Sequence, residues 1–286
     1  MSPQAQRNHD AAPPEPAIDV SRLRVTPGRT VDLARIATRA TDGFDGDKTA
    51  GRTRLEQLTA RLGQLQHLLA AAADRALLVV LQAPDAGGKD GTIRAIFTGV
   101  NPQGTRVTSF KAPTQTELAH DYLWRVHAHM PAKGEIMVFN RSHYEDVLVV
   151  KVHGLVPPDR IERRYGHIND FERLLVDEGT TVVKVFLHIS KEEQGIRLQQ
   201  RLDDPTKRWK FRRGDLDERA HWPAYQQAFE VMLERTSTAI APWYVVPADR
   251  NWFRDLAVAQ ILVDALETMD LQYPPPEEGL AGLKVI

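Results

Sequence analysis

Apolar and polar residues along the chain follow two different periods. Short apolar runs bounded by turn residues are typical of buried strands, and they occupy 77–82, 106–110, 135–140, 181–189 and 243–247. Between these runs, apolar residues recur every three or four positions, as they do on one face of a helix. This second period predicts helices over 53–73, 92–98, 114–129, 158–178, 190–202, 221–238 and 252–269.

Strands that alternate with helices build parallel βαβ units. We therefore expect an α/β fold: one parallel sheet with helices on both faces, in which ligands bind at the carboxyl ends of the strands. The first 30 residues hold five prolines and few large apolar groups, which predicts a loosely docked arm. We place a largely irregular arm at 1–50, one globular domain at 51–272 and a loose extension at 273–286.

Composition excludes several classes of protein. The chain has no cysteine, so it forms neither disulfides nor thiolate metal sites. Its 37 basic and 38 acidic residues give a net charge of −1, whereas general nucleic-acid binders are usually basic, so any anion site must be local. No apolar run approaches the roughly 20 residues that cross a bilayer, and no signal-peptide core is present. We predict a cytoplasmic protein without a nucleic-acid or membrane partner.

The most informative motif is the apolar run 77–82 followed by a Gly-rich turn that ends in Lys89. Backbone N–H groups of such a turn bind phosphate, and Lys89 adds a full charge. The motif departs from the Walker A pattern, because Ala83 replaces the first Gly and Asp90 replaces the Ser or Thr. Asp85 would repel phosphate, which predicts a bridging Mg²⁺. The alternative is a tightly packed turn whose acids pair with neighbouring cations. The predicted phosphate-binding loop residues are Gly87, Gly88, Asp90, Gly91 and Thr92.

A second polar cluster follows the strand 135–140. In P-loop enzymes an acid at this place helps to hold the metal. Asn140 occupies that position here, and Asp146 is the candidate replacement carboxylate. The planar guanidinium of Arg141 matches phosphate oxygens, and Glu145 could accept hydrogen bonds from a ribose, a base amine or a metal-bound water. Ser142 is a further candidate for ligand binding. The alternative is an ordinary strand-to-helix turn with an ion-paired surface.

A third motif places five cations within seven residues, 207–213. The segment lies between two predicted helices, so it suits a mobile lid that brings positive charge over a polyanion. The alternative is a solvated run of charges. Lys111 follows a strand and Arg125 lies on a predicted helix, and each is either a phosphate ligand or a surface charge. The other predicted ligands in this basic surface are Arg201, Lys207, Arg208 and Lys210, with Arg197 beside them.

Taken together, these residues resemble the polyphosphate kinase 2 family, and most closely its third class. The resemblance covers residues 50–272 and rests on four segments: 85–92, 139–148, 209–216 and 241–249. It implies a fold similar to thymidylate kinase with a helical lid at about 203–218, and phosphoryl transfer between inorganic polyphosphate and AMP, ADP or ATP with Mg²⁺ or Mn²⁺. Guanine nucleotides stay candidate substrates. The chain departs from the family at Ala83, where Gly is expected, and at Gly87, where Ala is more usual.

The resemblance also implies a role for single residues. Asp85 matches the loop acid that holds metal and assists transfer, and Lys89 matches the lysine that binds the phosphoryl group during its transfer. Arg141 matches a phosphate-binding arginine. Asn140 stands where other classes carry Asp, and this exchange, together with Glu145, is associated with accepting both mono- and diphosphates. The predicted catalytic set is therefore Asp85, Lys89 and Arg141, and the predicted metal ligands are Asp85 and Asp146.

Two other functions are open to this sequence. The first is an ATP-dependent nucleoside monophosphate kinase of the same architecture, for which the basic lid would be oversized. The second is a P-loop protein without catalytic activity that binds nucleic acid through 207–213, and the net charge makes it the weaker candidate. We also expect a homo-oligomer, a dimer or a tetramer, with the helix at 53–73 as a candidate interface.

Overall fold

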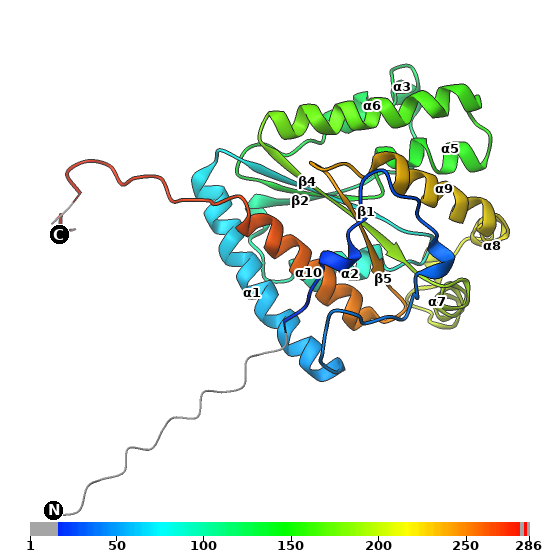
Figure 1. Ribbon diagram of the computed structural model, residues 1–286, viewed down its shortest axis with the longest axis horizontal. Coiled ribbons are helices and arrows are strands. Elements are labelled where there is room, and N and C mark those ends of the chain that lie inside the picture. The colour runs from blue at the N-terminus through cyan, green and yellow to red at the C-terminus, as the bar shows by residue number, and fades with distance from the viewer. Residues whose placement is uncertain (1–16, 281–282, 285–286) are drawn as a thin grey trace, which may run out of the picture.

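The computed structural model describes residues 17–280 and 283–284, which form a five-stranded sheet with helices on both faces (Figure 1). The strand order is β2-β3-β1-β4-β5, and every neighbouring pair is parallel. The carboxyl ends of all strands therefore meet at one edge, as the predicted α/β fold requires. The strands are β1 (Ala76–Gln82), β2 (Thr105–Ser109), β3 (Ile136–Asn140), β4 (Thr180–His188) and β5 (Trp243–Pro247).

Ten α-helices and five short 3-10 turns connect and cover these strands within the described residues. Among them, no helix combines the length and the apolar character that crossing a membrane would need. The helices are α1 (Lys48–Ala72), α2 (Lys89–Phe97), α3 (Gln115–Leu118), α4 (Trp124–His127), α5 (Val149–Val152), α6 (Pro158–Asp177), α7 (Lys191–Asp203), α8 (Gly214–Ala220), α9 (Trp222–Thr236) and α10 (Asn251–Glu267). The 3-10 turns are η1 (Ser21–Leu23), η2 (Leu33–Arg35), η3 (Pro102–Gly104), η4 (His143–Asp146) and η5 (Arg208–Lys210).

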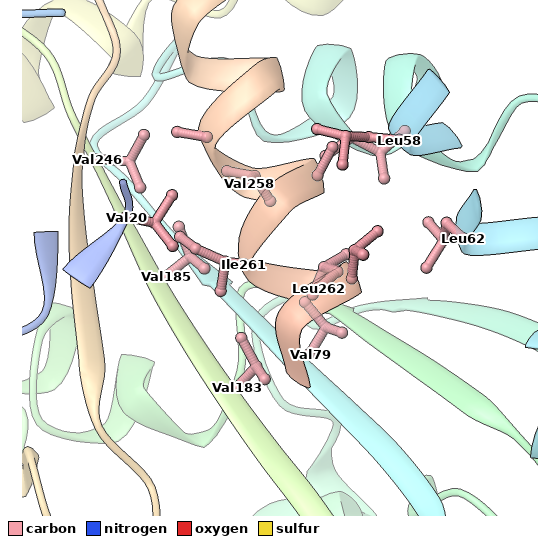
Figure 2. Close-up of a cluster of buried hydrophobic side chains, with 14 of the residues drawn as sticks. Val20, Leu58, Leu62, Val79, Val183, Val185, Val246, Val258, Ile261 and Leu262 are labelled. Atoms are coloured by element: carbon pink, nitrogen blue, oxygen red, sulfur yellow. The ribbon is translucent and has the colours of Figure 1, made fainter. Parts of the chain in front are cut away.

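The sheet separates two hydrophobic cores. Successive residues of β1 alternate between them: Val79 joins the core under α1 and α10, whereas Val80 joins the core under α6 and α9. Side chains of α10 such as Val258 and Ile261 pack onto the sheet in the first core (Figure 2). All seven residues of β1 are buried, so this central strand is a rigid base for the loop that follows it.

One predicted helix is interrupted. The segment 114–129 forms only the short helices α3 and α4, because the Asp121 carboxylate accepts hydrogen bonds from the N–H groups of Leu123 (2.9 Å) and Trp124 (3.1 Å) and starts a new turn. The predicted helix 221–238 is present as α9, which begins at Trp222 after the separate helix α8 and has Pro223 in its first turn. The other predicted helices are present with ends shifted by a few residues.

The N-terminal arm is irregular but not loosely docked, which corrects the sequence-based expectation for residues 17–30. The side chains of Ile18, Val20 and Val25 are buried, and the N–H of Val25 donates to the carbonyl of Trp243 on the edge strand β5 (2.8 Å). Pro27, the one proline in this range, therefore does not prevent docking, because the apolar residues before it reach the core. Residues 1–16 lie outside the described part of the chain.

Candidate active site

The loop between β1 and α2 turns through two residues with positive φ. These are Ala86 (59°) and Gly88 (105°), and Gly88 is the N-cap of α2. A Cβ on Gly88 would lie 2.1 Å from an Nη atom of the buried Arg254, so this position requires glycine. The turn presents the first N–H groups of α2, which have no partner inside the helix, together with the positive end of its dipole. Gly91 lies exposed on the first turn.

The two departures from the family pattern compensate each other. A Cβ on Gly87 would lie 2.5 Å from the Cβ of Ala83 and 2.8 Å from the carbonyl oxygen of Pro84. The methyl group of Ala83 therefore occupies the space that a methyl group at position 87 would need. Ala83 and a glycine at position 87 therefore fit each other in this loop.

Lys89 reaches back across the loop. Its Nζ donates to the carbonyl oxygen of Ala83 (2.9 Å) and is 3.4 Å from that of Pro84, and the residue is only 8% exposed. Burial, together with the nearby Arg141 guanidinium, lowers the pKa of Lys89 to about 8, against the opposing effect of Asp85. A cation that is short of solvent and held only by carbonyls is prepared to bind an incoming phosphate.

Arg141 connects the loop to the end of β3. Its guanidinium pairs with the Asp85 carboxylate and lies 3.6 Å from that of Glu145. Arg141 has a positive φ of 63°, and its N–H donates to the carbonyl of Leu81 (3.1 Å), which fixes this uncommon backbone conformation. The predicted catalytic residues Asp85, Lys89 and Arg141 thus lie together, as the parallel sheet requires of residues that follow β1 and β3.

Asp90 links the same site to the lid. The amide of Asn140 donates to one carboxylate oxygen of Asp90 (2.6 Å), and the ammonium of Lys210 lies 3.6 Å from the other. Asn140 therefore occupies the end of β3 as expected, with its amide nitrogen engaged. The Lys210 contact shows that the basic segment between α7 and α8 reaches over the first turn of α2.

A pocket opens beside the loop and was not predicted. Its floor includes Asp85, Arg141 and Glu145, and its wall comes from the start of α9 and from Glu218 on α8. The hydroxyl of Tyr225 donates to Glu218 (2.7 Å). This wall is built from helices that are distant from the loop in sequence, so no local motif could have indicated it.

Two predicted site residues lie in a different cavity, between the α3–α4 segment and α6. Asp146 is 3.2 Å from Arg164 and 4.0 Å from Arg125. Arg125 is buried and donates to the carbonyl of Lys111 (2.9 Å). Asp146 is therefore balanced by arginines and does not line the pocket of Asp85, which corrects its predicted role as a metal ligand. The carboxylate that does accompany Asp85 is Glu145.

Two further predicted ligands have no accessible side chain. Ser142 is completely buried and caps η4 by accepting the N–H of Tyr144 (3.2 Å). Thr92 is also completely buried and donates to Asp255 of α10 (3.2 Å). Both residues stabilise the elements that carry the site, so their side chains are not ligands. The side chain of Lys111 is exposed at the end of β2.

The loop is supported from outside by two arginines. Arg197 was expected on the basic surface, but it is largely buried and donates to the carbonyls of Gly87 (3.1 Å) and Ala248 (2.6 Å). Arg254 was not identified from the sequence. It pairs with Asp255 (2.8 Å) and lies against Gly88. Arg197 thus anchors the carbonyl of Gly87, and Arg254 fills the space next to Gly88.

The other basic residues of the lid face solvent. Lys207 pairs with Asp204 (2.7 Å) and Arg208 donates to a backbone carbonyl, while Trp209 is 76% exposed. Arg201 is half-buried and has no hydrogen bond or ion pair with any residue that the structure describes. The lid contains the turn η5 rather than a continuous helix, so its cations are displayed on an extended loop.

The residues present fit a divalent cation bound together with phosphate. The described part of the chain holds no group of three or more metal-binding side chains. Mg²⁺ does not require one, because it usually takes one or two carboxylates and completes its shell with water and substrate phosphates. Asp85 and Glu145 line one pocket and offer hard oxygen donors beside the phosphate-binding loop.

A parallel sheet whose central strand enters a Gly-rich loop and a helix that begins with Lys is the arrangement of P-loop proteins. Within that class, the model of the family described as polyphosphate kinase 2 matches residues 45–274. The chain therefore belongs to the polyphosphate kinase 2 family, as the motifs predicted.

Individual relatives cover almost the whole chain. An AMP/ADP-polyphosphate phosphotransferase of Meiothermus ruber is 56% identical over 258 residues, covering 90% of this chain and 97% of the relative. An ADP-polyphosphate phosphotransferase of Rhodopseudomonas palustris is 42% identical, covering 90% and 93%. The crystal structure of polyphosphate kinase 2 from Arthrobacter aurescens TC1 superimposes with a TM-score of 0.88 at 47% identity, covering 91% of this chain and 93% of that one.

Proposed function

We propose that this protein is a polyphosphate-dependent nucleotide kinase that transfers the terminal phosphoryl group of inorganic polyphosphate to AMP and ADP. The observation that carries the proposal is the position of the buried Lys89 in a phosphate-binding loop, beside the Arg141–Asp85 pair. Relatives of nearly full length bear the names of AMP/ADP- and ADP-polyphosphate phosphotransferases. A cytoplasmic location and a homo-oligomeric state remain predictions from the sequence.

The reaction is an in-line displacement at phosphorus. An oxygen of the nucleotide phosphate bonds to the terminal phosphorus of the polymer, the bridging P–O bond breaks, and the polymer leaves one unit shorter. Charge spreads over the equatorial oxygens in the transition state, so catalysis depends on positioning and neutralisation. Lys89 and the loop N–H groups hold those oxygens from one side. Arg141, which is 36% exposed, can turn from Asp85 toward them from the other.

We further propose that Asp85 and Glu145 hold Mg²⁺ or Mn²⁺, which would neutralise phosphate charge when bound. Replacing Asp85 by Asn should lower kcat/KM about a hundredfold and raise the Mg²⁺ concentration for half-maximal rate, because the amide is a weaker ligand than the carboxylate. Magnesium titrations of initial rate measure this. Asp170→Asn on the far face of α6 removes the same charge and serves as control. An unchanged magnesium dependence in Asp85→Asn would exclude this residue as a ligand.

The lowered pKa of Lys89 predicts an alkaline limit. In the free protein the ammonium deprotonates as the pH rises through about 8, so kcat/KM for polyphosphate should fall above that pH. A bound polyanion favours the charged form and raises the pKa, so kcat should persist to higher pH than kcat/KM. Initial rates at saturating and subsaturating donor separate the two profiles. A kcat/KM that stays constant through pH 9.5 would contradict the assignment.

The proposed function is tested by product analysis without ATP. The protein, AMP, long-chain polyphosphate and Mg²⁺ should yield ADP and then ATP, resolved by chromatography. The competing ATP-dependent nucleoside monophosphate kinase makes no product under these conditions and makes ADP when ATP replaces the polymer. The lid cations near Asp90 favour the polymer, because a single nucleotide triphosphate would use only part of that basic surface.

A further inference from the structure

A second basic cavity, of about 520 Å³, lies between the N-terminal arm, the start of α1 and the connection from β5 to α10. Four cations line it, and we call it the basic bowl: Arg39, Lys48, Arg52 and Arg250. They come from three separate segments of the chain, so no single run of the sequence indicates the cavity. None of them belongs to the motifs that identify the family or to the site described above.

The cations of the basic bowl outnumber the carboxylates that line it. None of its four cations makes a hydrogen bond or an ion pair through its side chain with any residue in the described ranges, and all four are exposed. Two carboxylates also line the cavity, but Asp255 is already paired with Arg254. Asp249 accepts hydrogen bonds from Thr38 (2.8 Å) and from the N–H of Ser190 (2.9 Å). A concave surface with this balance concentrates anions.

The walls of the bowl are held in place by packing. A Cβ on Gly51 would lie 2.6 Å from the indole ring of Trp252, so glycine lets α1 approach α10 closely and brings Arg52 next to the β5–α10 connection. On the other side, Thr38 donates to Asp249 and its carbonyl accepts the N–H of Asp249 (3.1 Å). This double contact fixes the arm immediately before Arg39. The cations are thus displayed on a built framework.

The bowl is connected to the phosphate-binding loop through one side chain. Asn251, which lines the bowl, accepts hydrogen bonds from Arg197 (3.0 Å) and Arg254 (2.8 Å), the two arginines that support the loop. The bowl lies on the α1–α10 face of the sheet, whereas the pocket beside Asp85 is walled by α8 and α9. The basic bowl and the pocket beside Asp85 therefore lie on different sides of the loop.

We infer that the basic bowl binds the distal phosphates of a long inorganic polyphosphate chain while the end of that chain lies at Lys89. The inference rests on the proposed function and adds a subsite that selects donors by length. A polyphosphate chain carries a negative charge on every unit, so it can occupy the loop and the bowl at once. We expect tripolyphosphate, which has only three units, to occupy the loop alone. A nucleoside triphosphate would instead place its neutral base in the basic bowl. Four cations without ion-pair partners suit an anion better than a neutral base.

The double variant Arg39→Gln/Arg52→Gln tests the subsite. We expect the ratio of kcat/KM for long-chain polyphosphate to kcat/KM for tripolyphosphate to fall about tenfold, because each exposed cation contributes a few-fold to binding a polyanion. Arg75→Gln/Lys133→Gln is the matched control, since it removes two exposed cations at the opposite edge of the sheet, before β1 and β3. The control should keep the ratio of the unmodified protein.

Two results would overturn the inference: an unchanged ratio in the bowl variant, or an equal fall in both variants, which would indicate general attraction by net charge. Equilibrium binding of long-chain polyphosphate, measured in parallel, separates this inference from the proposed function. If the unmodified protein transfers no phosphoryl group from polyphosphate, the proposed function fails. Even then, the inference predicts that the bowl variant binds the polymer about tenfold more weakly than the unmodified protein, whereas the control variant does not.

Discussion

Replacing Lys89 by Ala should lower kcat with ADP and polyphosphate about a thousandfold and leave the fold intact. The ammonium is the one full positive charge inside the loop, and removing such a group from a preorganised phosphoryl-transfer site typically costs two to three orders of magnitude, on the order of 3–4 kcal/mol. Steady-state rates and circular dichroism measure the two effects. Lys133→Ala, an exposed lysine before β3, is the control for loss of charge.

The variant Lys89→Met distinguishes loss of chemistry from loss of structure. Methionine retains an unbranched apolar side chain like the aliphatic part of lysine, but it carries no charge. In the unmodified protein, burial lowers the pKa of the Lys89 ammonium from 10.5 to about 8. Such a shift corresponds to about 3 kcal/mol of unfavourable interaction at neutral pH. The Met variant should therefore be inactive and melt no lower than the unmodified protein. Near-full activity of either variant would remove Lys89 from the mechanism.

Replacing Lys184 by Met should destabilise the protein by about 3–5 kcal/mol, since it leaves a buried carboxylate without its partner. Lys184 in β4 is completely buried and contacts Glu172 (2.5 Å), the hydroxyl of Tyr144 (3.0 Å) and the carbonyl of Thr236 (2.6 Å). The charge of Lys184 holds the pKa of Glu172 below its usual value although burial opposes this. Urea denaturation measures the change in the free energy of unfolding.

The double variant Glu172→Gln/Lys184→Met completes this prediction. Removing both charges should recover part of the stability lost in Lys184→Met, because no unpaired buried ion remains. Tyr144 belongs to η4, directly after Arg141, so the single variant should also lower activity through the position of that turn. If Lys184→Met is as stable as the unmodified protein, Glu172 and Lys184 are not energetically coupled. The same conclusion follows if the double variant is less stable than Lys184→Met.

The sequence predicted those parts of the molecule that depend on local patterns. The continuous apolar run at 77–82 forms β1, which is buried on both faces, and the following Gly-rich turn forms the expected loop. Since the carboxyl ends of β1 and β3 are neighbours, Asp85 and Arg141 meet although 56 positions separate them. The predicted parallel sheet placed both residues at one edge, and the structure adds that β1 and β3 are neighbours.

The parts that sequence did not predict depend on tertiary contacts. Whether a polar residue faces a ligand or the interior is decided by the elements around it: Ser142 contacts Gln82 of β1 and Thr92 contacts Asp255 of α10, so both are buried although they lie within the motifs. Asp146 follows Glu145 directly, but successive residues of a tight turn point in different directions, and Asp146 meets Arg164. Arg254 supports the loop from a helix 165 positions beyond Lys89, with no pattern of its own.

The central claim is that the loop around Lys89 receives the end of an inorganic polymer and passes one unit to a nucleotide. It is tested most directly by a crystal structure of the protein with AMP, Mg²⁺ and a polyphosphate analogue whose bridging atoms resist cleavage. The account predicts the terminal phosphate of the analogue at Lys89 and the loop N–H groups, the nucleotide phosphate in line with it, and a cation at Asp85. Both substrates bound away from the loop, with no cation beside Asp85, would contradict it.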